Sequence, residues 1–132
     1  MIKQEKQLRN IKNIMKSFWK KDVAFEQLKK ETILPVWFSY QEKNTIVGFI
    51  NGYIIDYGYC KIAQIENIEV HQEFQGKGIG YTLMDSFIQS CKKQGVSTLS
   101  LRVECDNKHA ISLYKKCGFT QDKKGVLMEL TF

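Results

Sequence analysis

A glycine-rich segment in the middle of the chain has the composition of a phosphate-binding loop. It runs Gln75-Gly76-Lys77-Gly78-Ile79-Gly80, between a predicted strand over residues 61–70 and a predicted helix over residues 79–95. A strand that ends in glycines and leads into a helix exposes backbone N–H groups at the positive end of the helix dipole, where phosphate oxygens bind. Lys77 adds a cationic donor. The glycines alone also suit a tight turn that binds nothing, so the segment by itself leaves both interpretations open.

The spacing of the glycines excludes two common phosphate-binding loops. The dinucleotide pattern G-x-G-x-x-G fails because Tyr81 stands where the third glycine belongs. The nucleoside triphosphate loop fails because the chain contains no G-K-[ST] sequence. A phosphate site here would therefore belong to another class of protein.

A second motif follows downstream and narrows the choice. It is carried by residues 107–119, Asn107-Lys108-His109-Ala110-Ile111-Ser112-Leu113-Tyr114-Lys115-Lys116-Cys117-Gly118-Phe119. This segment resembles N-x-x-A-x-x-L-Y-x-x-x-G-F of the GNAT N-acetyltransferases, and residues 75–80 resemble that family's Q/R-x-x-G-x-G/A signature. The two motifs in this order are more specific than either alone. The resemblance covers residues 45–132 well and the N-terminal helices only by their order.

The resemblance implies an enzyme that moves an acetyl group from acetyl-CoA directly to a primary amine. The N–H groups of residues 75–80 are implied to hold the coenzyme A pyrophosphate, and the pantetheine arm to lie along the strand that ends at Val70. Asn107 is implied to contact the pantetheine or a nearby water, and it can also cap the following helix. The expected cofactor-binding residues are Ile68, Val70, Gln75, Gly76, Lys77, Gly78, Ile79, Gly80 and Asn107. No metal is expected, because the four cysteines form no C-x-x-C pair.

Two side chains are the expected catalysts. Tyr114 matches the family's tyrosine that faces the coenzyme A sulfur as general acid, although its helical stripe also suits a core position. A carboxylate could take the proton of the acceptor ammonium, and Glu66 and Glu69 are the nearby candidates. Residues three apart on a regular strand point to opposite faces, so one of the two at most is expected to face the acceptor. By similarity to the family we choose Glu66, with Glu69 or water as alternatives.

The elements that position these residues predict one mixed α/β domain over residues 1–132. A strand, helix and strand in the middle predict a parallel pair, and hairpins predict antiparallel strands on both sides. The expected fold is therefore the GNAT fold, a single mixed and mostly antiparallel sheet flanked by helices. The family's usual first strand could come only from residues 1–4, so it is short or absent. The expected helices cover residues 5–19, 22–31, 79–95 and 108–117, and the expected strands cover 34–40, 45–55, 61–70, 97–105 and a hairpin within 119–132.

Composition says less about the binding partners of the protein than the two motifs do. The formal net charge of +6 suits an anionic partner, so a basic nucleic-acid or protein interaction module on the same fold is the alternative function. Nucleic acid is the less expected partner, because the chain lacks aromatic-flanked RNA motifs and helix-turn-helix spacing. Without an export signal or a membrane-spanning apolar run, the expected location is the cytoplasm. The acceptor stays open between a peptide and a small-molecule amine, and a homodimer is expected only by family habit.

Overall fold

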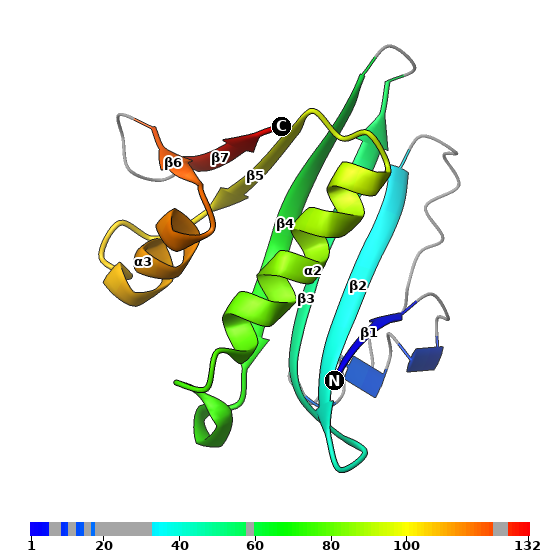
Figure 1. The fold of residues 1–132 in the computed structure, drawn as a ribbon, viewed down its shortest axis with the longest axis vertical. Coiled ribbons are helices and arrows are strands. Elements are labelled where there is room, and N and C mark those ends of the chain that lie inside the picture. Colours follow the sequence, from blue (N-terminus) through cyan, green and yellow to red (C-terminus); the bar gives the residue numbers. More distant parts are fainter. Residues whose placement is uncertain (6–8, 11–12, 15–16, 18–32, 58–59, 123–126) are drawn as a thin grey trace.

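A single seven-stranded sheet organises the molecule, which we describe from a computed structural model (Figure 1). The structure describes residues 1–5, 9–10, 13–14, 17, 33–57, 60–122 and 127–132. The strand order is β1-β2-β3-β4-β5-β7-β6, and every neighbouring pair is antiparallel except β4 and β5. The elements are β1 (Ile2–Glu5), β2 (Ile33–Glu42), β3 (Thr45–Asp56), β4 (Lys61–Val70), η1 (Gln72–Phe74), α2 (Ile79–Lys93), β5 (Thr98–Arg102), α3 (Lys108–Lys116), β6 (Thr120–Gln121) and β7 (Leu127–Thr131). The predicted mixed sheet, with its one parallel pair, is confirmed.

Helix α2 covers one face of the sheet and creates the main core. The ring of Phe87 on α2 meets Phe38 on β2 edge to face, with 6.5 Å between ring centroids. On the other side of the sheet, Trp37 and Phe49 stack at 5.7 Å. We call the two sides the α2 face and the opposite face. The α2 face is built from Val36, Phe38, Ile50, Ile54, Ala63 and Ile65, which pack in one cluster with Ile79, Leu83, Met84, Phe87, Ile88 and Cys91 of the helix.

A β-bulge interrupts β4 where it parts from β5. The parallel pairing covers only four residue pairs, from Ile62 with Thr98 to Ile65 with Leu101. At the same point the register with β3 shifts, so that Asn67 lies opposite Asn51 but Ile65 lies opposite Gly52. Glu66 is the extra residue between them. β4 then continues to Val70 with no β5 beside it, because β5 ends at Arg102 and not near residue 105 as predicted.

Gly52 is the residue that makes room for this bulge. A Cβ atom at this position would lie 2.0 Å from the backbone oxygen of Gln64, a separation that real Cβ atoms do not show. We therefore expect Gly52→Ala to lower the free energy of unfolding by about 2 kcal/mol or more, because the backbone must shift to accept the methyl group. Chemical denaturation of both proteins measures the change.

Gly80→Ala is the matched control for that substitution. Its Cβ would meet only the Leu113 side chain, at 3.4 Å, which is ordinary contact. Alanine is also the better helix former, so this variant should unfold at the same or a higher denaturant concentration than the wild type. Equal stabilities of the two variants would contradict the role assigned to Gly52.

The N-terminal prediction was partly wrong. A first strand does exist, and it includes Glu5, which was expected to begin a helix. Glu5 pairs with Trp37 in the β1–β2 ladder, and its buried Oε1 accepts a hydrogen bond from Ser39 Oγ at 3.0 Å. Residues 9–10, 13–14 and 17 are helical, as predicted. The predicted helix over 22–31 lies outside the described residues. No helix in the described part of the chain has both the length and the apolar character needed to cross a membrane.

Candidate active site

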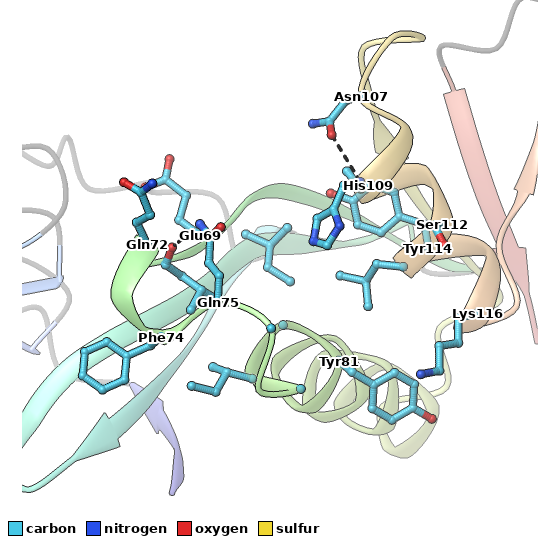
Figure 2. A pocket seen from close by; sticks show the side chains of 18 of the residues that line it. Glu69, Gln72, Phe74, Gln75, Tyr81, Asn107, His109, Ser112, Tyr114 and Lys116 are labelled. Carbon is cyan, nitrogen blue, oxygen red and sulfur yellow. Dashed lines mark hydrogen bonds between the residues drawn. The ribbon is translucent and has the colours of Figure 1, made fainter.

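A cleft of about 780 Å³ lies between the N-terminus of α2, helix α3 and the end of β4 (Figure 2). Most of the residues expected to bind the cofactor line it, although they are far apart in the sequence. Lys77 and Glu66 are the exceptions among the expected site residues. The expected residues that line the cleft are Ile68, Val70, Gln75, Gly76, Gly78, Ile79, Gly80, Asn107 and Tyr114.

The glycine loop presents the N-terminus of α2 to this cleft. Gly76 and Gly78 have φ angles of +79° and +80°, which side chains disfavour, and this is why glycine suits both positions. Gly78 is the N-cap residue and, as a glycine, has no side chain that could cap the first N–H groups of the helix. The helical hydrogen bonds begin with Thr82 N donating to Gly78 O at 3.1 Å. The N–H groups of the first helical turn are therefore available to an anion in the cleft.

The polar side chains of Gln75 and Lys77 contact neighbouring parts of the same segment. Gln75 Nε2 donates to the backbone oxygen of Val70 at 3.0 Å, which ties the loop to the end of β4. Lys77 Nζ lies 5.1 Å from the centroid of the Phe74 ring, in cation–π contact. The cationic donor expected at the phosphate site thus packs on Phe74 in this structure, and the loop's candidate groups for an anion at the cleft are its backbone N–H groups.

The last part of β4 offers backbone hydrogen-bonding groups along its free edge. His71 N donates to Val47 O at 2.8 Å, so the backbone of His71 points toward β3. Backbone groups alternate in direction along an antiparallel strand. The N–H and C=O groups of Ile68 and Val70 therefore point away from β3, to the side where β5 has ended, and both residues line the cleft. Of these groups, the Val70 oxygen already accepts the hydrogen bond from Gln75 Nε2. A ligand with amide groups could pair there as an added strand does.

Tyr114 brings a phenol to the same cleft. It lies on α3, is 7% exposed, and its ring stands 6.1 Å from that of Phe119. Burial first, and then the nearby Cys117, raise the pKa of Tyr114, so the phenol keeps its proton at neutral pH. Asn107 lies at the start of α3, where its Oδ1 accepts from Ala110 N at 3.2 Å. Its predicted role as helix cap is confirmed, and it lines the cleft as well.

Glu66 stands on the opposite face of the sheet. Tyr53 on β3 donates to Gln64 Oε1 at 3.2 Å. The pKa of Tyr53 is raised by partial burial and then by the charge of, and a hydrogen bond with, Glu66. Glu69 lies opposite Phe49, which is four residues from Tyr53 and so on the same face of β3. The expectation that Glu66 and Glu69 point to opposite faces was therefore wrong, because the bulge adds a residue between them.

The comparison with known proteins decides the class of the molecule. The chain matches the Acetyltransferase (GNAT) family over residues 6–119. The chain belongs to the GNAT family. The resemblance inferred from the two sequence motifs is thereby confirmed.

Individual GNAT relatives agree with this assignment. The ribosomal protein bS18-alanine N-acetyltransferase of Escherichia coli (strain K12) is 39% identical over 59 residues, which are 45% of this chain and 40% of that protein. The crystal structure of the Escherichia coli ribosomal-protein-S18-alanine N-acetyltransferase matches 99% of this chain and 94% of its own, with a TM-score of 0.71 and 22% identity. PaiA N-acetyltransferase from Thermoplasma acidophilum, in complex with coenzyme A, matches 76% of this chain and 62% of its own, with a TM-score of 0.63 and 26% identity. The chain spans about half the length of the curated relatives it matches, such as 44% and 54% of two of them.

Two further residues of this GNAT chain frame the outer part of the cleft and were missed from the sequence. Tyr81 on α2 and Lys116 on α3 both line it, and Lys116 Nζ lies 5.4 Å from the centroid of the Tyr81 ring. The contact joins two helices that also approach at Gly80, where an added Cβ would meet Leu113 at 3.4 Å. The only signal in the sequence was that Tyr81 and Lys116 each stand within or next to one of the two motifs.

Proposed function

We propose that this GNAT chain transfers an acetyl group from acetyl-CoA directly to the primary amine of a peptide N-terminus. The observation that carries the proposal is the convergence of three features on one cleft. These are the N-terminus of α2, the unpaired edge of β4 and the buried phenol of Tyr114. The names of the ribosomal protein alanine N-acetyltransferases support a peptide acceptor. The four free thiols fit the reducing cytoplasm as its location.

The cleft residues suit coenzyme A in both of its chemically distinct parts. The N–H groups that follow Gly78 suit the pyrophosphate, since they are free of helical partners and lie at the positive end of α2. The N–H and C=O of Ile68 and the N–H of Val70 suit the amides of pantetheine, because they point to the edge left open by β5. When bound, acetyl-CoA supplies a thioester whose sulfur is a tolerable leaving group.

Tyr114 and Glu66 divide the proton transfers between the two faces of the sheet. Tyr114 lines the cleft and keeps its proton at neutral pH, which supports it as the acid that protonates the departing thiolate. Glu66 stands on the opposite face, at the point where the β4–β5 pairing stops after Ile65 and Leu101. In this proposal an ammonium that reaches Glu66 on that face loses its proton to the carboxylate, directly or through water, and becomes a neutral nucleophile.

Calorimetry with acetyl-CoA tests the proposal at the glycine loop. We expect micromolar binding by the wild type, and weaker binding by Gly76→Asp than by Gly76→Asn. Both substitutions suit the positive φ of +79° and find open space, so they differ in charge alone. A carboxylate near the pyrophosphate should raise Kd by about 10-fold relative to the amide.

The same protein is then offered acetyl-CoA and a panel of amines, with free thiol release as the readout. Transfer to peptides that begin with alanine is the expected result. Absence of acetyl-CoA binding by the wild type would overturn the proposed function. Binding of nucleic acid that weakens steeply with salt, without transfer to any amine, would favour the interaction module instead.

A further inference from the structure

A pair of asparagine amides lies next to Glu66 on the opposite face of the sheet. Asn51 on β3 and Asn67 on β4 are directly opposite each other, and Asn67 Nδ2 donates to Asn51 Oδ1 at 3.0 Å. Both side chains are half-buried. Within the described residues this is the one hydrogen bond that either side chain makes. Two groups of the pair therefore make no hydrogen bond within the described residues, the donor Asn51 Nδ2 and the acceptor Asn67 Oδ1, while Asn67 Nδ2 and Asn51 Oδ1 each use only part of their capacity.

The bulge is what brings this pair beside the proposed base. In a regular strand Glu66 and Asn67 would point to opposite faces, but the extra residue puts both on the side of Tyr53 and Asn51. The stacked rings of Trp37 and Phe49 lie on the same face, with Trp37 opposite Asn51 in the β2–β3 ladder. Half-buried amides beside aromatic rings are partly shielded from water, where a hydrogen bond contributes more than it does at an exposed surface.

The remaining groups match the backbone of an extended peptide. In an extended chain the N–H and C=O of one residue point to the same side, as they do when they pair with a strand. One donor and one acceptor side by side are the complement of that pattern. The terminal amine and the N–H of the second residue of a peptide are one residue apart along its backbone. Glu66 and Asn67 are also one residue apart, so the two spacings are similar.

We propose that the Asn51–Asn67 pair binds the N–H and C=O of the second residue of the acceptor peptide while Glu66 receives its terminal amine. This inference rests on the proposed acetyl transfer and adds the element that selects a peptide over a simple amine. Asn67 Oδ1 accepts the peptide N–H, and Asn51 Nδ2 donates to the peptide C=O. The acceptor is thereby fixed by its backbone, and the pair makes no demand on the second side chain.

The test combines a protein variant with a modified peptide. Asn67→Leu removes the acceptor oxygen, and methylation of the second residue's amide nitrogen removes the donor it would meet. Each change alone is expected to raise KM for an alanine-initiated peptide by about 10-fold with kcat little altered. The two changes together should raise KM no further than either one alone. Titration of the peptides into protein saturated with coenzyme A should show the same pattern in Kd. Gln89→Leu, which removes an exposed amide from α2, is the matched control and should behave as wild type.

Each outcome bears on the inference. Additive effects of the variant and the methyl group would overturn the assigned contact, because two changes that act independently share no hydrogen bond. Efficient transfer to simple alkylamines but not to peptides would overturn both this inference and the proposed peptide acceptor, and would leave acetyl transfer from acetyl-CoA intact. No transfer to any amine by the wild type would overturn the proposed function and the role of the pair together. Thermal unfolding of Asn67→Leu near the wild-type temperature shows that a KM effect does not come from loss of fold.

Discussion

Tyr114→Phe is expected to lower kcat by about 10²-fold or more, since it removes the proton donor and keeps the ring that packs against Phe119. Burial keeps the pKa of this phenol above its ordinary value of 10.0, so the proton is present throughout the neutral range. Steady-state kinetics measure the loss, and calorimetry should find nearly unchanged affinity for acetyl-CoA.

Tyr40→Phe removes a hydroxyl from a half-buried tyrosine of β2 that packs against the same core, away from the cleft. This control should keep wild-type turnover. Equal kcat values for Tyr114→Phe and the wild type would remove Tyr114 from the mechanism. A parallel loss of acetyl-CoA affinity would make its role one of shaping the cleft.

Glu66→Gln is expected to lower kcat at neutral pH by about 10²-fold, because the amide keeps the size of the side chain but cannot take a proton. An α-amino group has an ordinary pKa of about 7.7–8.0, so more of it is already neutral as pH rises through that range, and the need for a base falls. The ratio of wild-type to variant turnover should therefore shrink as pH rises from 7 to 9. A pH profile of kcat for both proteins measures this.

Glu69→Gln decides between the two carboxylates. Both lie on the opposite face. Glu66 is at the point where β4 and β5 separate, whereas Glu69 lies nearer the end of β4 and is one of the residues that line the cleft. We expect the smaller loss for Glu69→Gln. A larger loss for Glu69→Gln would transfer the role of base to Glu69, and small losses for both would leave water as the proton acceptor.

The sequence predicted the elements around the cleft well, because each has a strong local pattern. Strand β4 has the predicted bounds, Lys61–Val70, and the stripe from Ile79 to Cys91 is buried along α2 as expected. The two motifs also identified most of the cleft lining, since the glycine loop and α3 each carry their residues on a short continuous segment.

The errors came from features that depend on pairing between segments. The bulge at Glu66 arises where β4 meets Gly52 of β3, and alternation along one strand gives no sign of it. The early end of β5 also depends on pairing between strands. The alternating apolar pattern continues to Val103, which is buried, but the strand itself ends at Arg102. Glu5 was assigned to a helix because the apolar residues that follow it recur at helical spacing. Its place in a strand depends instead on the ladder with Trp37 and the hydrogen bond from Ser39, which the local pattern does not show. Lys77 contacts Phe74, three residues earlier, and spacing alone does not predict the direction of a lysine side chain.

The position of the bulge means that two substrates are aligned by one short stretch of continuous backbone. In the mechanism we propose, Ile68 and Val70 offer backbone groups to the acetyl donor, and Glu66 and Asn67 offer side chains to the amine on the opposite face. Their separation is set by peptide geometry and does not depend on how a loop is placed. Sequence changes elsewhere in the domain can therefore alter which amines reach the site, while the distance over which the acetyl group travels stays the same.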